Sequence, residues 1–231
     1  MATYDLAQQE ELDNVKHLWT KYGSLISWTL VVVLLAFAGW TGYKYWQQQR
    51  GVAAGGLYEE LDKAAATGDV DKAVKAFNDL KDGYAGTTYA QQGALLVAKV
   101  QAGSDKADEA GANLQWLIDS GNNKDLVAVA RLRQAGLLLD AGKHDEALKV
   151  LDDSVPESFQ ALVNDRRGDI LVVQDKRDEA VKAYQSAWKA MSPQVDYRRF
   201  IEIKLTALGV APEAKSASDK SVQATSDASA P

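Results

Sequence analysis

The side chains that could carry out chemistry are few and far apart in this sequence. There is no cysteine, which excludes thiolate nucleophiles, disulfides and thiolate metal ligands. The two histidines, His17 and His144, are too distant in the chain to form one local metal-binding motif. Asp165 and Asp169 share one face of a predicted helix, a spacing that is typical of a solvated helix surface. We therefore predict no catalytic residue, no metal site and no cofactor.

Charge and composition indicate a helical protein without a nucleic-acid partner. The formal net charge is -6, and basic residues are spread along the chain rather than gathered in one region. A phosphate backbone requires a local excess of Lys and Arg, so we expect no binding to nucleic acid. Only four prolines occur, and residues that favour helices dominate after position 50. Any binding surface is therefore expected to be built from helices.

Four copies of one short pattern predict where these helices lie. The pattern begins at Val70, Ala107, His144 and Arg177, with an aspartate second and an alanine fourth in every copy. The aspartate suits the first turn of a helix, where the helix dipole favours negative charge. The alanines Ala73, Ala110, Ala147 and Ala180 are 37, 37 and 33 residues apart. This spacing is close to the period of about 34 residues in helical-hairpin repeats.

Each alanine is paired with a large residue four positions later on the same helix face. These residues are Phe77, Leu114, Leu151 and Tyr184, which we expect to fill the space between neighbouring helices. The turns before the first three copies contain Gly68, Gly103 and Gly142, whereas the fourth has Gln174 and Asp175. The spacing also predicts preceding helices at 126–140 and 161–173, and a capping helix at 197–208 that follows Pro193.

In the fourth copy the spacing resembles a tetratricopeptide repeat. Gly168 lies twelve residues before Ala180, as the glycine and alanine of such a repeat do, while Gly136 is one residue out of register in the third copy. A helical bundle without true repeats is the alternative. In the usual register the first helix of each hairpin lines a concave surface that binds peptides or proteins. The candidate groove residues are Val129, Leu132, Leu162, Asp165, Asp169 and Val172, although packing between hairpins would also explain them.

Residues 22–43 contain no charged side chain and predict a transmembrane helix. At about 1.5 Å per residue this segment is roughly 33 Å long, enough to cross a hydrocarbon core of about 30 Å. Aromatic residues at its two ends would lie at the membrane interfaces, namely Trp19, Tyr22, Trp40, Tyr43 and Trp46. Ala38 and Gly42 form a small-residue pair that could contact a partner helix.

The alternative for this segment is a cleavable signal peptide, because Ala36 and Ala38 flank Phe37 in a small-x-small site. The acidic residues that precede the segment disfavour that alternative, since a signal peptide begins with a basic region. Two basic residues flank the segment on each side, so charge leaves its orientation open.

The predicted architecture is all-α: a single N-terminal transmembrane helix followed by a solenoid of helical hairpins like those of tetratricopeptide repeats. The segments are a short N-terminal region at 1–21, the transmembrane helix at 22–43, a linker at 44–52, four hairpins with a capping helix at 53–210, and a disordered tail at 211–231.

The N-terminal residues add a resemblance to a known family. Tyr4, Gln8, Gln9, Glu10, Glu11, Asp13, Lys16, Trp19, Lys21 and Gly23 precede the apolar run, which ends with Tyr43 and Trp46. Together with the degenerate repeats, over roughly residues 4–210, this stretch resembles the YfgM-type ancillary subunits of the bacterial Sec translocon.

The resemblance implies a non-enzymatic, single-pass protein of the bacterial inner membrane, with a cytoplasmic N-terminus and a periplasmic repeat domain. It implies binding to the SecYEG translocon, to a PpiD-like periplasmic chaperone and to unfolded secretory chains, with membrane lipid around the anchor. The expected role is to help hand secreted proteins to periplasmic chaperones.

Two other functions fit the same residues. The repeats could be a membrane-tethered scaffold that binds proteins of envelope assembly. Alternatively, the chain could be a regulator whose N-terminal region, residues 1–21, binds a cytoplasmic signalling protein.

Overall fold

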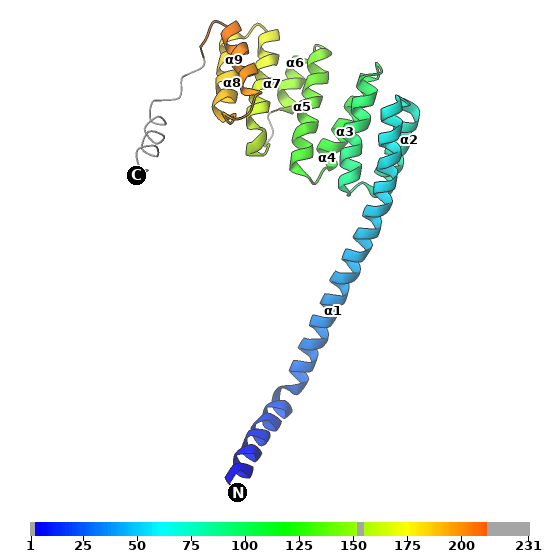
Figure 1. Cartoon of the computed structure of the whole chain (residues 1–231), viewed down its shortest axis with the longest axis vertical. Coiled ribbons are helices and arrows are strands. Elements are labelled where there is room, and N and C mark those ends of the chain that lie inside the picture. The colour runs from blue at the N-terminus through cyan, green and yellow to red at the C-terminus, as the bar shows by residue number, and fades with distance from the viewer. Residues whose placement is uncertain (1–2, 152–154, 212–231) are drawn as a thin grey trace, which may run out of the picture. The chain divides into compact units, whose positions relative to one another are not determined.

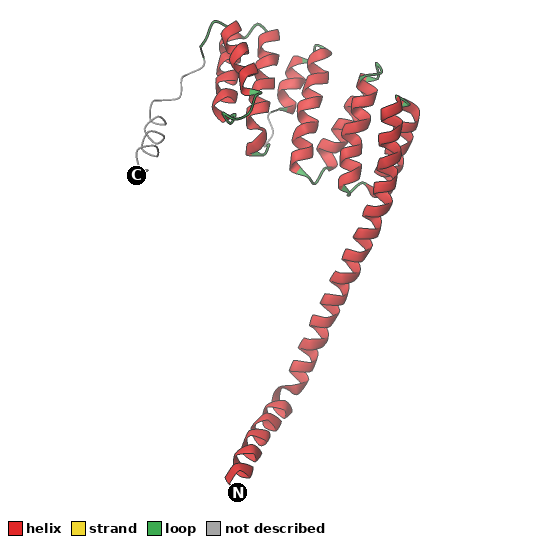
Figure 2. Cartoon of the chain, in the orientation of Figure 1, coloured by secondary structure: helices red, strands yellow, loops and turns green. Residues whose placement is uncertain are grey.

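The computed structural model describes residues 3–151 and 155–211, and the side chains within these ranges from Ser27 onward. All regular elements in the described ranges are helices, as Figure 2 shows, so the all-helical fold predicted from the sequence is confirmed. The chain divides into two compact units, Met1–Ala53 and Ala54–Pro231. The predicted tail, apart from Ala211, lies outside the described residues.

The first unit belongs to helix α1 (Thr3–Thr67). Its large apolar side chains are exposed, with Leu30 at 60% and Phe37 at 67% of their full accessible area. No helix among the described residues combines the length and apolar character that crossing a membrane requires. The transmembrane helix at 22–43, which begins before the described side chains, stays a prediction.

The second unit is a stack of helical hairpins that follow one another in chain order (Figure 1). Each helix packs against the next, and the first helices of successive hairpins also touch, because α3 contacts α5 and α5 contacts α7. The last turns of α1 precede α2 (Val70–Tyr84), α3 (Thr88–Ala102), α4 (Ala107–Ser120), α5 (Lys124–Asp140), α6 (His144–Val150), the 3-10 helix η1 (Glu157–Phe159), α7 (Gln160–Val173), α8 (Arg177–Ala190) and α9 (Arg198–Ala207).

The four sequence copies form the second helices of the hairpins. Helices α2, α4, α6 and α8 begin at the first residue of each copy, as predicted. The four alanines Ala73, Ala110, Ala147 and Ala180 are all 0% exposed. Their large partners are also buried, at 0% for Phe77, 1% for Leu114 and Leu151, and 3% for Tyr184. The alanine therefore allows close approach of a neighbouring helix, and the larger side chain fills the hairpin interior.

The turn before each of these helices has one residue in the left-handed conformation. It lies two positions before the helix in every hairpin, with φ 72° at Gly68, 59° at Asp105, 73° at Gly142 and 60° at Asp175. The next amide N–H donates to a carbonyl five residues back, at 2.8 or 2.9 Å, which completes a Schellman motif. In the second turn the glycine, Gly103, does not take this conformation, since its φ is -73°. The longer second turn transfers the left-handed position to Asp105, and aspartate tolerates that conformation better than most residues.

In the second, third and fourth hairpins, the residue twelve positions before the alanine complements the large partner in size. In the second and third hairpins Ala98 and Ala135 accompany leucines, whereas in the fourth Gly168 accompanies Tyr184. A Cβ atom added to Gly168 would lie 2.6 Å from Cδ1 of Tyr184. The glycine at this position therefore makes room for the tyrosine ring.

Helix α6 has only seven residues, about half the length of α2, α4 and α8. Two arginines from first helices satisfy carbonyls at its C-terminal end. Arg131 Nη1 donates to Val150 O at 3.1 Å, and Arg167 Nη2 donates to Leu151 O at 3.2 Å. Positive charge at a helix C-terminus is favourable, so these contacts stabilise a short helix between its neighbours.

Candidate partner-binding groove

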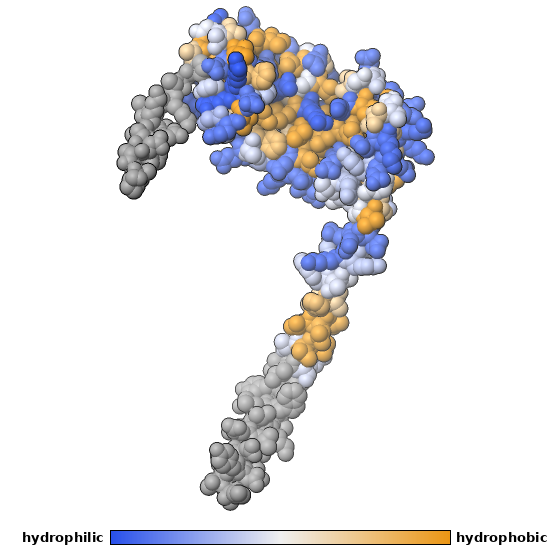
Figure 3. Space-filling model, viewed as in Figure 1, coloured by the Kyte–Doolittle hydropathy of each residue, from blue (hydrophilic) through white to orange (hydrophobic). Residues whose placement is uncertain are grey.

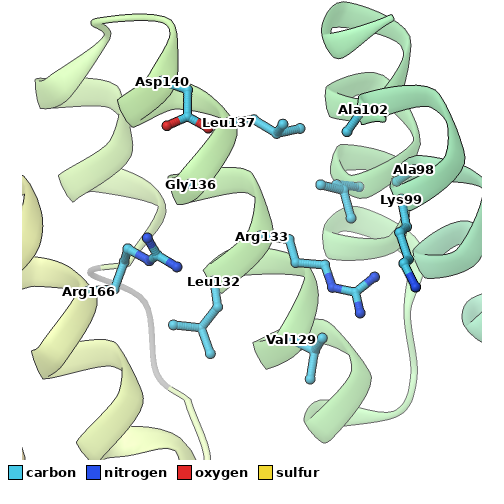
Figure 4. A pocket seen from close by; sticks show the side chains of 11 residues that line it. Ala98, Lys99, Ala102, Val129, Leu132, Arg133, Gly136, Leu137, Asp140 and Arg166 are labelled. Carbon is cyan, nitrogen blue, oxygen red and sulfur yellow. The ribbon is translucent and has the colours of Figure 1, made fainter. Parts of the chain in front are cut away.

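A cavity of about 480 Å³ lies over α5, at the centre of the repeat domain. We call it the α5 groove. Its size falls within the range of about 300–1,000 Å³ that is typical of ligand sites. Figure 4 shows its lining, to which α3 contributes Ala98, Lys99 and Ala102, α4 Leu114, α7 Arg166, and α5 Val129, Leu132, Arg133, Gly136, Leu137 and Asp140.

The floor of the α5 groove is apolar. Leu114, Val129 and Leu137 belong to or pack against the core cluster of the first hairpins, whereas Leu132 packs against the cluster beyond α5. The groove therefore lies over α5, the helix that separates these two core clusters. Figure 3 shows apolar side chains gathered over the middle of the repeat domain with hydrophilic ones around them.

Four charged side chains line the same groove. Lys99, Arg133 and Arg166 are cationic, and Asp140 is the one carboxylate among the lining residues. Arg133 is held in place because its Nη1 donates to Leu95 O at 2.7 Å. Arg166 Nη1 lies 3.9 Å from Asp169 Oδ2. Figure 4 shows Asp140 at one end of the groove, apart from the three cations.

The structure places two of the six predicted groove residues, Val129 and Leu132, in this lining. Leu162 is half-buried against the cluster formed by α7, α8 and α9, and Val172 is 41% exposed. Neither residue lines the α5 groove. A role of any of these residues in partner binding stays a prediction.

Asp165 and Asp169 instead join α7 to the helices that follow it. Lys204 Nζ of α9 lies 2.8 Å from both carboxylate oxygens of Asp165 and 2.6 Å from Asp169 Oδ1. Tyr197 donates its hydroxyl to Asp165 Oδ2 at 2.8 Å, and Tyr184 donates to Asp169 Oδ1 at 2.8 Å. Asp165 is 3% exposed, so α9 covers it. Asp165 and Asp169 therefore have a packing role, which was the alternative to partner binding, because their carboxylates hold the capping helix in place.

Burial and neighbouring carboxylates raise the pKa of both tyrosines above the ordinary value. For Tyr184 the main cause of the raised pKa is desolvation, followed by its hydrogen bond to Asp169. For Tyr197 the pKa is raised by desolvation and then by its hydrogen bond to Asp165. Both phenols therefore remain protonated donors to the carboxylates.

Sequence reasoning missed Lys99, Arg133, Leu137 and Arg166. The repeat register contained a signal for Lys99, because it follows Ala98, which lies twelve residues before Ala110. Lys99 is thus the equivalent of Asp169 in the fourth hairpin. The approach of Arg166 to the groove carries no such signal, since it depends on how α7 lies against α5.

The predicted anchor residues belong to the first unit. Trp40, Tyr43 and Trp46 are more than half exposed. Lys44 lies over the Trp40 ring at 5.4 Å, and Arg50 lies over the Trp46 ring at 4.7 Å.

The other predicted anchor positions are open or undescribed. Ala38 is exposed, and a Cβ atom added to Gly42 would have no atom within 4 Å. The side chains of Trp19 and Tyr22 lie outside the described residues.

The geometry defines a class of helical-hairpin repeat protein with a groove suited to a protein or peptide. In the part of the chain that the structure describes, no group of three or more His, Cys, Asp or Glu could hold a metal ion. A family model described as a tetratricopeptide repeat-like domain matches residues 16–210. The chain belongs to this tetratricopeptide repeat-like family.

The resemblance predicted from the sequence is confirmed by curated relatives named "Ancillary SecYEG translocon subunit". The relative from Neisseria gonorrhoeae is 29% identical over 207 residues, which cover 88% of this chain and 98% of the relative. The relative from Haemophilus influenzae is 25% identical, covering 82% of this chain and 92% of its own length. The relative from Escherichia coli K12 is 26% identical, covering 79% of this chain and 86% of its own length.

Proposed function

We propose that this chain is a non-enzymatic ancillary subunit of the Sec translocon in a bacterial inner membrane. The observation that carries the proposal is the match over 98% of the Neisseria relative, whose name states this association. The match covers 88% of this chain, which is more than the repeat domain at 53–210 alone, and this supports a shared assembly rather than a shared repeat fold alone.

The proposed anchor is the helix at 22–43, with the N-terminus cytoplasmic and the repeat domain periplasmic. Support comes from the exposed apolar side chains of the first unit, such as Leu30, Val33 and Phe37, at 60%, 59% and 67%. A continuous apolar surface of this kind is unfavourable in water and suits lipid. The aromatic rings of Trp40 and Trp46, each with a cation above it, suit the adjoining interface.

The proposed partner surface is the α5 groove, which would bind a PpiD-like chaperone or an emerging secretory chain. Its apolar floor and its position on the first helices of the hairpins support this role. In this function the repeat domain holds the partner near the translocon during handover to periplasmic chaperones.

The test is photo-crosslinking in cells with the full chain. A crosslinking residue replaces Leu132 in the groove, Gly42 in the proposed anchor, or Lys182 on the exposed surface of α8 as the control. We expect Gly42 to crosslink to a SecYEG subunit and Leu132 to a periplasmic chaperone or a secretory chain, whereas Lys182 gives neither product. Recovery of none of these partners would overturn the proposal.

Other products would favour the alternatives. Crosslinks from Leu132 to cell-wall enzymes would support the envelope scaffold. A cytoplasmic signalling protein that is lost when residues 1–21 are deleted would support the regulator. For the topology, a reporter fused after Pro231 that is active only outside the cytoplasm is expected to be active, and an inactive fusion would contradict a periplasmic repeat domain.

A further inference from the structure

We infer that the α5 groove selects extended polypeptide segments in which a carboxylate lies beside apolar side chains. This inference rests on the proposed function and specifies the chemistry of the partner segment. It follows from the placing of Lys99, Arg133 and Arg166 around an apolar floor.

The floor accounts for the apolar part of this preference. Leu114, Val129, Leu132 and Leu137 line the cavity together with Ala98 and Ala102. An apolar side chain that enters the groove removes its own surface and part of these side chains from water, which favours binding. Gly136 leaves the middle of the α5 side open, because a Cβ atom added there would meet no atom within 4 Å.

The charge of the lining accounts for the preference for a carboxylate. Three cationic residues against the single carboxylate of Asp140 give the groove a formal charge of about +2, in a chain with a net charge of -6. The local charge of the groove is therefore opposite in sign to the charge of the whole molecule. The apolar floor has a low dielectric constant, so it screens the charges at its rim less than water would.

Two of the three cations form no ion pair within the described part of the chain. Lys99 and Arg133 form no ion pair with a described residue, and Arg166 lies 3.9 Å from Asp169, whose Oδ1 is bonded to Lys204. The Arg133 bond to Leu95 O uses one of five N–H donors and fixes the guanidinium group. Fixed donors of this kind lose little conformational freedom when a carboxylate binds.

The same features disfavour other segments. A segment with Lys or Arg beside its apolar side chains would place like charges together, which opposes binding. A segment that is only apolar would bury its side chains but would leave Lys99 and Arg133 without an ion-pair partner. The α5 groove should therefore rank segments as acidic-apolar, then neutral-apolar, then basic-apolar.

The test uses the full chain in a non-ionic detergent and three fluorescein-labelled nine-residue peptides. The peptides share three leucines and differ at two positions, which hold glutamate, glutamine or lysine. Fluorescence anisotropy is expected to give a Kd for the glutamate peptide about three- to tenfold lower than for the glutamine peptide, and a still higher Kd for the lysine peptide. The difference should shrink as salt is raised from about 50 to 500 mM, because salt screens partly exposed charges.

Three variants check that binding occurs in the α5 groove. Lys99→Glu combined with Arg166→Gln turns the formal charge of the lining from about +2 to about -1, so the lysine peptide should bind more tightly than the glutamate peptide. Gly136→Leu should raise the Kd of all three peptides at least fivefold, because the new side chain occupies the floor of the groove. Its Cβ atom would meet no atom within 4 Å, so the change should not disturb the fold. Lys182→Glu, on the exposed surface of α8, should leave the Kd values of all three peptides unchanged.

The outcomes separate this inference from the proposed function. Equal Kd values for the three peptides, no saturable binding, or unchanged binding in a folded Gly136→Leu chain would overturn the inference. Circular dichroism confirms that each variant is folded. If the peptides fail while the crosslinks to SecYEG remain, the proposed function stands without this specificity. If the peptides bind as expected while those crosslinks are absent, the specificity of the α5 groove stands and the proposed function fails.

Discussion

The ammonium nitrogen of Lys204 lies 2.8 Å from both carboxylate oxygens of Asp165, although 39 residues separate the two in the chain. The Asp165 side chain is 4% exposed and that of Lys204 is 28% exposed. The pair joins the capping helix α9 to α7 beside the buried side chains Ile201 and Leu205. The end of the repeat stack is therefore closed by an ion pair as well as by apolar packing.

Replacement of Lys204 by methionine should destabilise the repeat domain strongly. The change keeps the aliphatic part of the side chain but leaves the buried Asp165 carboxylate without its cation. We expect the free energy of unfolding to fall by about 3 kcal/mol, since removing one partner of a buried pair leaves an uncompensated charge. Urea unfolding of the full chain followed by circular dichroism measures this loss. Lys182→Met, at an exposed position of α8, is the control, with an expected change within about 0.5 kcal/mol. Equal effects of the two variants would contradict the role of the pair.

Tyr184 should make stability fall at alkaline pH. Its pKa is raised in the folded chain above the ordinary value of 10.0, mainly by burial and then by the hydrogen bond to Asp169. The unfolded chain therefore loses this proton first, so the stabilisation is complete below pH 10 and is lost as pH rises above it. The slope can reach about 1.4 kcal/mol per pH unit for one tyrosine. Thermal unfolding between pH 8 and 11 should be less dependent on pH in Tyr184→Phe than in the native chain. Parallel profiles for the two proteins would exclude this contribution.

The left-handed turns should distinguish two glycines that lie six residues apart. Gly142 has φ 73° in the turn between α5 and α6, so Gly142→Ala should lower the free energy of unfolding by about 1 kcal/mol. Gly136 lies inside α5 with open space around its Cβ position, so Gly136→Ala should raise it by up to about 1 kcal/mol. Differential scanning calorimetry of both variants checks the opposite signs. A change of the same sign in both would contradict the assignment of the turn.

The size match between Gly168 and Tyr184 should appear as an energetic coupling. Gly168→Ala alone should cost about 1–3 kcal/mol, because the added carbon meets the tyrosine ring. Tyr184→Leu in the same chain recreates the alanine and leucine pair of the second and third hairpins. The double variant should therefore be more stable than the sum of the single changes by about 1–2 kcal/mol. A double-mutant cycle from urea unfolding measures this difference, and additive effects would mean that the two positions do not share one space.

The sequence alone was sufficient for the starts of α2, α4, α6 and α8 and for their inward faces. Ala73 and Phe77, like their counterparts in the other hairpins, are placed by the helical period, because residues four apart lie on the same face. Asp69, Thr87 and Asn123 cap their helices with their own side chains, a signal that is also local. The repeat period of 37, 37 and 33 residues then indicated a stack of hairpins.

Only the tertiary structure decided which polar residues face a partner and which are buried. Asp165 and Lys99 both lie on first helices, yet α9 covers Asp165 while Lys99 lines the α5 groove. The helical period specifies the face on which a side chain lies but not what packs against that face. That depends on the rotation from one hairpin to the next and on the stacking of α9 after α8, both of which result from contacts between residues far apart in the chain.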